Sequence, residues 1–588
     1  MVKTLFRQIK QYKKVSILTP IFTALEVVME VAIPFVIAYI IDKGISAGDM
    51  GQVYLYGGVM IVMAFLSLLF GALAGKYAAA ASSGFACNLR EGMYENIQRF
   101  SFSNIDKFST AGLVTRMMTD VTNVQNAYQM VLRIAVRAPV MLICSLAMCF
   151  FINAEMSTIF LVAIAVLAVG LVFIMLTTMK IFDQVFRKYD DLNASVQENV
   201  SAIRVVKAFV REKYENEKFS SAAQRLYRMF VKAEGRLAFN NPLMMLVIYS
   251  SMIGLSWLGA HNIVGGTLTE GELTSMFTYV MSVLMSLMML SMIFVMITMS
   301  LASGRRIVEV LEEQPDITNP SAPVMEVESG SIDFNNVSFS YKHGSGEETL
   351  HDINLHIKAG ETIGIIGGTG CGKSSLVSLI SRMYDVSKGS VFVGGRDVRE
   401  YDLEVLRDSV AVVLQKNVLF SGTILDNLRW GKEDATEEEC IEVCRQACAD
   451  EFIERFPDGY NTWIEQGGAN VSGGQKQRLC IARALLKHPR VLILDDSTSA
   501  VDTATDAKIR AAFAQKIPGT TKLIIAQRIS SVQGADRILV LDDGCVNGFD
   551  THENLLKNNE IYRDIYETQT QGGGDFDQPG GALEGGAD

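Results

Sequence analysis

The fold of the second half of this chain is decided by one stretch, Gly367-Gly368-Thr369-Gly370-Cys371-Gly372-Lys373-Ser374. It fits the pattern G-x-x-x-x-G-K-[ST], which is the phosphate-binding loop. The apolar run before it, at 362–366, predicts a buried strand, and residues 374–384 after it predict a helix. Strand, loop and helix in this order are the context that the motif requires. The stretch therefore predicts a nucleotide-phosphate site in an α/β domain.

The residue types in this loop suit an anion. Glycines let backbone N–H groups turn onto phosphate oxygens without a Cβ in the way. The helix that follows offers its positive N-terminal end. Lys373 adds a mobile positive charge, and the Ser374 hydroxyl is placed to ligate Mg²⁺. The predicted cofactors are thus ATP and Mg²⁺, with the phosphates held along 367–375, up to Ser375.

The composition changes along the chain. With 588 residues the protein is too long for a single core, so we expect at least two domains. Of its 28 methionines, 26 precede residue 313. The net charge of −11 argues against a nucleic-acid partner. Cys440, Cys444 and Cys448 repeat at helical spacing without a nearby fourth ligand, so we interpret them as structural.

Six apolar segments in the first half reach the length of about 20 residues that spans a bilayer. We predict spans near 15–41, 54–75, 134–153, 157–179, 237–260 and 273–303. The first lacks a small-residue cleavage site, so we expect a retained membrane helix. The connections at 42–53, 154–156 and 261–272 hold one lysine and no arginine, whereas those at 76–133 and 180–236 are long and basic. The positive-inside rule then places both termini and the two long connections in the cytoplasm of a multi-pass cell-membrane protein.

Both long connections are expected to be helical extensions of the spans. Two short turns, near 103–112 and 210–216, would project furthest and suit contact with a soluble domain.

Two features within the predicted spans bear on a substrate. Glu26 and Glu30 share a face of the first span, where carboxylates are costly unless they meet a cavity or a partner. They either attract a cationic or proton-carrying substrate or pair with a base such as Arg133 or Arg137. A stripe on the sixth span either lines an adaptable pocket or faces lipid and neighbouring helices. Its members are Met281, Met285, Met288, Met292, Met296 and Met299.

The second half begins after a proline-containing segment. We predict a membrane domain at 1–312, a linker at 313–331, an ATPase domain at 332–569 and a disordered Gly- and acid-rich tail at 570–588. The fold class is a six-helix all-α membrane domain fused to a soluble α/β P-loop ATPase domain. Strands are expected at 332–339, 410–414, 491–494 and 522–526, with 537–541 as the last.

Polar residues at the ends of these strands complete the candidate site. Tyr341 is placed to stack on adenine, and Gln415 to reach the metal or its water. Asp495 follows a buried strand and is the expected Mg²⁺-organising carboxylate. A second anion site is predicted where Ser472 caps a helix, in the run Ser472-Gly473-Gly474-Gln475.

In order and spacing, these motifs resemble the nucleotide-binding domain of an ABC transporter. The six-span half with two long extensions is similar to an ABC exporter half-transporter, and the resemblance covers about residues 1–569. It implies a dimer in which each ATP lies between the Walker A loop of one chain and the signature, here Val471–Gln475, of the other. It also implies a D-loop at Ser499–Asp502 and coupling helices at the two projecting turns.

Two positions depart from the family pattern. The hydrolytic Glu is Asp496 here, and the switch-loop His is Gln527. An Asp carboxylate lies about 1.5 Å further back than that of Glu. A misplacement of about 1 Å costs roughly 10²-fold in rate. Gln527 lacks the positive charge that a His offers near the γ-phosphate. A third departure is Ile464-Glu465-Gln466, where exporters often have Gly-Glu-Arg.

These departures resemble the degenerate-site subunit of a bacterial heterodimeric multidrug exporter. The resemblance implies ATP-driven export of small amphipathic or hydrophobic compounds, a membrane-lipid environment and a partner half-transporter with an intact catalytic Glu. The alternatives are a homodimeric lipid or peptide exporter with a slow Asp496, and a nucleotide-gated channel or regulatory subunit.

Overall fold

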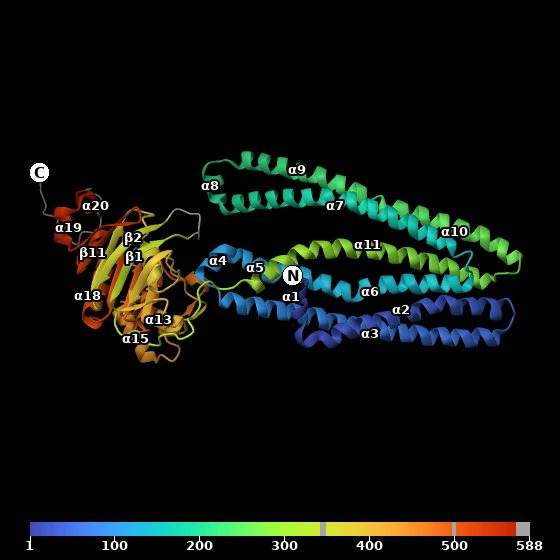
Figure 1. Cartoon of the computed structure of the whole chain (residues 1–588), viewed down its shortest axis with the longest axis horizontal. Helices are drawn as coiled ribbons and strands as arrows, with labels where there is room; N and C mark the ends of the chain where they lie inside the picture. Colours follow the sequence, from blue (N-terminus) through green and yellow to red (C-terminus); the bar gives the residue numbers. More distant parts are fainter. Residues whose placement is uncertain (342–347, 497–500, 572–588) are drawn as a thin grey trace. The chain divides into compact units, whose positions relative to one another are not determined.

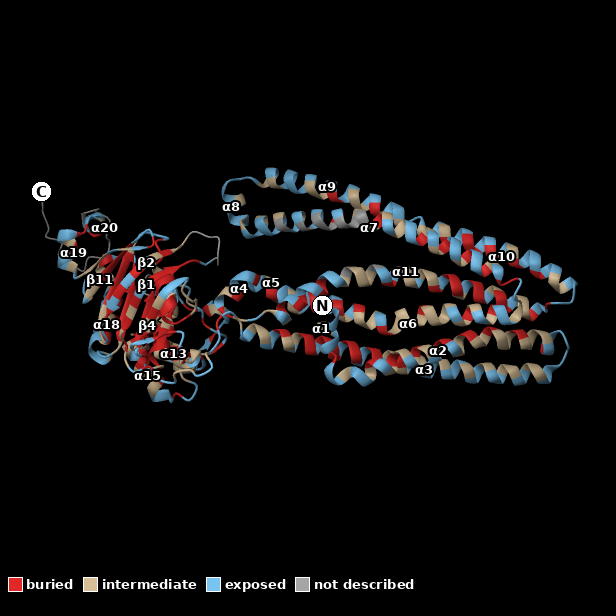
Figure 2. Ribbon diagram, viewed as in Figure 1, coloured by how far each residue is buried: buried red, intermediate tan, exposed pale blue. Residues whose placement is uncertain are grey.

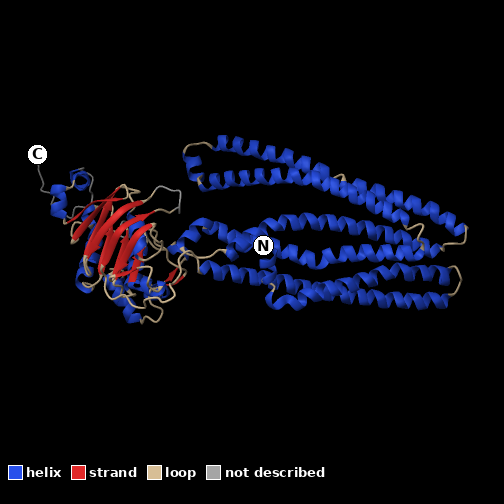
Figure 3. Ribbon diagram, in the orientation of Figure 1, coloured by secondary structure: helices blue, strands red, loops and turns tan. Residues whose placement is uncertain are grey.

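The computed structural model describes residues 1–341, 348–496 and 501–571. These residues form two compact units. The first unit contains Met1–Gln98 and Ser109–Glu313 and is helical (Figure 3). The second contains Arg99–Phe108 and the residues from Gln314 on, and it holds the β-sheets. The ten residues Arg99–Phe108 thus belong to the second unit although the first unit flanks them in sequence.

Helices, several of them long, build the first unit (Figure 1). They are α1 (Val2–Arg7), η1 (Lys10–Tyr12), α2 (Lys13–Tyr39), η2 (Ile40–Ile45), α3 (Met50–Gln98), α5 (Thr110–Thr115), η3 (Arg116–Asp120), α6 (Val121–Ile152), α7 (Thr158–Ser201), α8 (Ile203–Ala208), α9 (Glu212–Leu237), α10 (Asn240–Val264) and α11 (Glu270–Glu312).

Six helical stretches in the described residues are long and apolar enough to cross a membrane. They are Lys10–Ile45, Met50–Gln98, Thr110–Ile152, Thr158–Met179, Glu212–Val264 and Glu270–Glu312. Each covers one predicted span, to within a residue at the ends of that span. Many of their residues are exposed (Figure 2), and these include many large apolar side chains, which is the pattern of helices that face lipid.

Four of these helices, α2, α3, α6 and α11, pack on one another, and α7 pairs with α9 and α10. The far end of the α7–α9 hairpin turns through α8, and the turn itself lies at 209–211. Phe209 and Val210 at this turn are 74% and 79% exposed.

Two main sheets form the second unit, with strand orders β2-β1-β4-β5 and β12-β11-β3-β10-β9-β6. The strands are β1 (Ile332–Phe339), β2 (Leu350–Ile357), β3 (Thr362–Gly367), β4 (Lys388–Val393), β5 (Arg396–Asp397), β6 (Val410–Val413), β7 (Gly422–Thr423), β8 (Trp463–Ile464), β9 (Val491–Asp495), β10 (Thr521–Ile525), β11 (Arg537–Asp542) and β12 (Cys545–Asp550). In the six-stranded sheet the strands β11, β3, β10, β9 and β6 are parallel. The strands β7 and β8 form a separate pair.

The helices of this unit cover the sheets. They are α4 (Phe102–Phe108), α12 (Lys373–Ile380), α13 (Leu403–Ser409), α14 (Ile424–Arg429), α15 (Glu437–Gln446), α16 (Asp450–Ile453), α17 (Gly473–Leu485), α18 (Thr503–Lys516), α19 (His552–Asn558) and α20 (Glu560–Gln571), with short 3₁₀ turns at η4 (Gly459–Asn461), η5 (Gln466–Gly468) and η6 (Ile529–Ser531).

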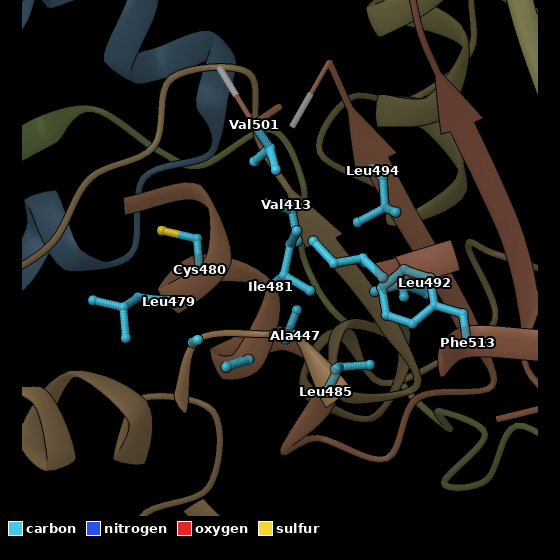
Figure 4. Close-up of a cluster of buried hydrophobic side chains, with 14 of the residues drawn as sticks. Val413, Ala447, Leu479, Cys480, Ile481, Leu485, Leu492, Leu494, Val501 and Phe513 are labelled. Atoms are coloured by element: carbon cyan, nitrogen blue, oxygen red, sulfur yellow. The ribbon is translucent and has the colours of Figure 1, made fainter. Parts of the chain in front are cut away.

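The core behind the sheet explains why these elements hold their places. Side chains of α17 such as Ile481 and Leu485 pack with Leu492 and Leu494 of β9 (Figure 4). Strand β9 is buried along its whole length, as expected for a central parallel strand. Cys440 and Cys444 are fully buried in the same core.

The predicted fold class is confirmed, with two local corrections. The helix after the phosphate loop ends at Ile380 and not at 384, because Arg382 adopts a left-handed φ of 50°. Arg537–Asp542 is not the last strand, since β12 follows it. Asp543 and Gly544, both with positive φ, form the tight turn of this hairpin, and an Asp-Gly pair is a known signal for it.

Candidate nucleotide site

The carboxyl ends of four parallel strands bring the predicted site residues to one edge of the sheet. Ile525 of β10 pairs with Asp495 of β9 and with Ile365 of β3. The phosphate loop follows β3, Asp496 follows β9, Gln527 follows β10 and Gln415 follows β6. Ligands of open α/β sheets bind at this edge.

The backbone of the phosphate loop has the shape that the motif predicts. Gly370 and Gly372 have φ values of 86° and 95°, which side chains rarely adopt. The positive φ of Gly372 strains any other residue, and a Cβ there would also lie 2.7 Å from a methyl group of Leu350, so glycine is favoured at this position. Lys373 Nζ donates to the carbonyl oxygens of Gly367 at 2.9 Å and Gly368 at 2.7 Å. The ammonium group is therefore already held over the loop.

The donor set next to the loop fits a hard divalent cation. Ser374 Oγ donates to Asp495 Oδ1 at 3.0 Å, so a hydroxyl and a carboxylate oxygen lie together. Asp495 is only 7% exposed. Burial raises the pKa of this carboxyl, and the neighbouring Asp496 raises it further, while Ser374 and Lys373 act in the opposite sense. Mg²⁺ prefers such oxygen ligands.

The two departures from the family pattern contact each other. Gln527 Nε2 donates to Asp496 Oδ2 at 2.9 Å. Asp496 also has a left-handed φ of 48°, and its N–H donates to the carbonyl of Ile525 at 3.1 Å. The carboxylate at the position of the hydrolytic base therefore accepts a hydrogen bond from a neutral amide.

The last helix, α20, is hydrogen-bonded to the loop after β10 that carries Gln527, a contact that the sequence did not reveal. Gln569 on α20 donates from Nε2 to the carbonyl of Gln527 at 2.9 Å. Its Oε1 accepts from the N–H of Ile529 at 2.8 Å. Nothing in the sequence around Gln569 distinguishes it from any other polar residue on an amphipathic helix.

Tyr341 lies beside the phosphate loop. Its hydroxyl is 2.9 Å from Ser375 Oγ, and the ring is half exposed. It meets Phe339 and Tyr384 edge-on, with centroid distances of 4.8 and 5.2 Å. An exposed aromatic ring at this distance from the loop is suited to a flat base.

The signature run starts a well-capped helix. Ser472 Oγ accepts from the N–H of Gln475 at 3.3 Å, and Gln475 Oε1 accepts from the N–H of Ser472 at 2.9 Å. This capping box confirms the predicted cap. In the described part of the chain, no hydrogen bond joins Ser472–Gln475 to the phosphate loop. Ser499 and Ala500 of the predicted D-loop, and residues 572–588 of the predicted tail, lie outside the described residues.

The acidic pair in the first span has a basic partner. Arg137 on α6 donates to Glu26 Oε1 at 2.6 Å and to Glu30 Oε2 at 2.5 Å. One guanidinium thus bridges both carboxylates and leaves a net charge of −1 in this cluster. On α11, Met281, Met285 and Met292 are exposed and Met288 is half buried.

A groove and a docked helix lie on the flank of the second unit. Helix α4 contacts this unit through Asp106, which accepts from the Tyr384 hydroxyl at 2.7 Å. Next to it, a groove of about 430 Å³ is lined by Phe102, Leu414, Phe420 and Trp430 among others. Phe420 and Trp430 stack at 4.0 Å and are themselves exposed.

The comparisons with known proteins agree with this geometry. Residues 16–288 match the family model of the ABC transporter transmembrane region, and residues 350–499 match the family model described as ABC transporter. The chain is 36% identical to an uncharacterised ABC transporter ATP-binding protein, YfiB, of Bacillus subtilis, over 95% of this chain and 97% of that one. The chain belongs to the ABC transporter family.

More distant relatives indicate the exporter type. The half-transporter is 31% identical to an ATP-dependent lipid A-core flippase of Desulfotalea psychrophila, over 97% of this chain and 99% of that one. Its structure resembles that of a bacterial Atm1-family ABC exporter with ATP bound, with a TM-score of 0.81 and 25% identity over 95% of this chain and 99% of the other. The protein is thus a multi-pass membrane exporter subunit whose ATPase domain binds and hydrolyses ATP.

Proposed function

We propose that this chain is the degenerate-site half of a heterodimeric ABC exporter. Its own Walker site would hold ATP and cleave it slowly, while its signature would complete the fast site on the partner. The observation that carries this proposal is the hydrogen bond from Gln527 Nε2 to Asp496 Oδ2. The short carboxylate is drawn to a neutral amide, so it is poorly placed to orient a water at the γ-phosphate.

The residues at the sheet edge divide the work of holding the nucleotide. Tyr341 would stack on adenine, and the backbone of 367–375 would hold the phosphates. Lys373 would exchange its two carbonyl partners for phosphate oxygens, which are stronger acceptors. Ser374, Gln415 and Asp495 would organise Mg²⁺, which supplies charge neutralisation at the phosphates.

The intact signature supports a partner chain. Ser472 and Gln475 form a rigid, capped helix start that presents N–H groups to an anion. Since no hydrogen bond joins this helix start to the phosphate loop among the described residues, we assign it to the nucleotide of a second half-transporter. That partner would supply the Glu that Asp496 replaces.

The dimer would also use the projecting turns. Phe209 and Val210 are exposed at the α8 turn, and the groove beside Phe420 and Trp430 has both apolar and basic walls. We propose that each subunit inserts its α8 turn into this groove of the other ATPase domain. The contact of Asp106 with Tyr384 would serve as the second coupling point within the chain.

We propose that the spans cross the plasma membrane and that both termini and the ATPase domain lie in the cytoplasm. The basis is the bias of Lys and Arg toward the long connections and the N-terminus.

The proposed substrates are small amphipathic compounds, including hydrophobic cations, which makes multidrug export the favoured activity. The cluster of Glu26, Glu30 and Arg137 keeps a net negative charge, and the exposed methionines of α11 provide an adaptable apolar face. A second candidate is a homodimeric lipid exporter, which is favoured by the relative named as a lipid A-core flippase.

The decisive experiment compares two variants in the complex purified with its native partner. Ser472→Ala should lower total ATPase strongly, because it damages the clamp on the competent site. Asp496→Asn should have little effect. An equal or reversed ranking would contradict the degenerate-site assignment. Substantial ATPase and lipid transport by this chain reconstituted alone would favour the homodimeric exporter, and ion current without substrate movement would favour a channel.

A further inference from the structure

An apolar cavity of about 500 Å³, partly open to the surface, lies at the N-terminal end of the chain in the first unit. Helix α1, the start of α2 and inner turns of α3, α6 and α11 all contribute to its wall. The lining includes Phe6, Ile17, Phe85, Leu132 and Leu301. Such a volume between packed helices is too large to be an ordinary packing defect.

The polar groups of the wall are nearly all satisfied within the protein. The Tyr128 hydroxyl donates to Ser16 Oγ at 2.8 Å, and Ser16 Oγ donates to the carbonyl of Tyr12 at 2.8 Å. Ser300 Oγ donates to a backbone carbonyl at 3.3 Å. The exception is Lys13, whose ammonium pairs with no carboxylate among the residues that the structure describes. The cavity therefore combines an apolar interior with the ammonium group of a lysine at its wall.

The position of the cavity along the helices places it at the edge of the bilayer. Lys13 immediately precedes the first apolar span, and Leu301 is followed closely by Arg305 and Arg306 at the end of the sixth. Helix α1 contributes Phe6 to the wall and exposes Lys3 and Arg7. A short helix with an apolar face toward the protein and basic side chains toward the solvent is typical of an element that lies in the membrane interface.

The first residues of the chain carry charge of a single sign. Residues 1–25 contain five basic side chains and no Asp or Glu. These are Lys3, Arg7, Lys10, Lys13 and Lys14. Of these, Lys10 lies 3.8 Å from Glu91, which belongs to α3. An anionic headgroup at the membrane surface is the complement of such a cluster.

We propose that this cavity binds one acyl chain of an anionic membrane lipid, with the headgroup held by Lys13. An acyl chain gains no hydrophobic free energy by leaving the bilayer for an equally apolar cavity. Selection must therefore come from the headgroup charge, so the site distinguishes anionic from zwitterionic lipids of the same chain length. This site is separate from the transported substrate and does not depend on the degenerate nucleotide site.

The test measures lipid retained by the complex purified from nanodiscs that contain phosphatidylglycerol and phosphatidylcholine with identical acyl chains. Lys13→Gln should reduce retained phosphatidylglycerol about fivefold, the factor that corresponds to roughly 1 kcal/mol for one cation near an anionic headgroup. Lys14→Gln is the matched control, because Lys14 is also exposed and does not line the cavity. Its retention should equal that of the wild type.

A second variant tests the cavity itself. Ala127, which lines the cavity and is 8% exposed, is replaced by Trp to fill the space. The Ala127→Trp variant should also lose the retained phosphatidylglycerol. The Lys13→Gln variant should keep the wild-type thermal unfolding temperature. Equal retention in Lys13→Gln and Lys14→Gln, or equal retention of phosphatidylcholine, would overturn the proposal. A photo-crosslinker at Phe6 that captures the partner subunit and no lipid would overturn it as well.

Discussion

Replacing Asp496 by Glu should create hydrolysis at this chain's own nucleotide site. The longer side chain moves the carboxylate forward by about 1.5 Å, past the reach of the amide that now binds it. Because a misplacement of about 1 Å costs roughly 10²-fold, correcting it should recover up to that factor, or about 2.7 kcal/mol of barrier. Gln527 would still lack the charge of a His, so Asp496→Glu/Gln527→His should be faster than Asp496→Glu alone.

The increase in hydrolysis at this chain's own site must be measured in a complex whose other ATP site, the competent one, is inactive. We therefore place Asp496→Glu in a Ser472→Ala background, in which the competent site has lost its clamp. Steady-state release of inorganic phosphate from this complex then reports the chain's own site. The matched control is Asp543→Glu, since Asp543 is exposed and has a left-handed φ of 43°, close to the 48° of Asp496. This variant reproduces the conformational free-energy cost of placing a Glu in a left-handed backbone conformation, and it leaves the nucleotide site unchanged.

Two results would refute the reasoning. If Ser472→Ala leaves ATPase near the wild-type level, the chain's own site is already competent. If Asp496→Glu raises the rate no more than Asp543→Glu does, the length of the side chain does not limit hydrolysis.

Two further predictions concern contacts that the structure revealed. Gln569→Ala should lower kcat severalfold in the Ser472→Ala/Asp496→Glu background without changing KM, because it releases the loop that carries Gln527. Thr568→Ala is the control. A change in KM alone would contradict this role of Gln569. Arg137→Met should destabilise the membrane domain by about 3 kcal/mol, because it leaves two carboxylates without their cation. Thermal unfolding in detergent should show this loss, with recovery in a variant that also carries Glu26→Gln and Glu30→Gln; a loss as large in Arg133→Met would contradict it.

Local signals predicted much of the fold. The phosphate loop was found because its glycines and Lys373 have fixed spacing, and the central strands because they are continuous apolar runs between turn residues. Six spans followed from length and hydropathy alone. Strand β12 was missed despite the Asp543-Gly544 turn signal, because it has no continuous apolar run and contains Asn547 and Gly548, which are uncommon in strands.

Contacts between distant segments were beyond sequence reasoning. Arg133 and Arg137 were equal candidates for Glu26 and Glu30 until the packing of α2 against α6 selected Arg137. Gln569 gave no signal, since its role depends on α20 packing against the loop after β10. The early end of α12 depends on a single left-handed residue, Arg382, which favours no turn by its type.

The most direct test of the central claim is the ATPase rate of the full-length chain purified alone in lipid nanodiscs, compared per site with that of the complex with its co-purified partner. The account predicts that the chain alone binds ATP and hydrolyses it roughly 10²-fold more slowly than the complex. A rate for the chain alone that equals the rate of the complex would contradict it.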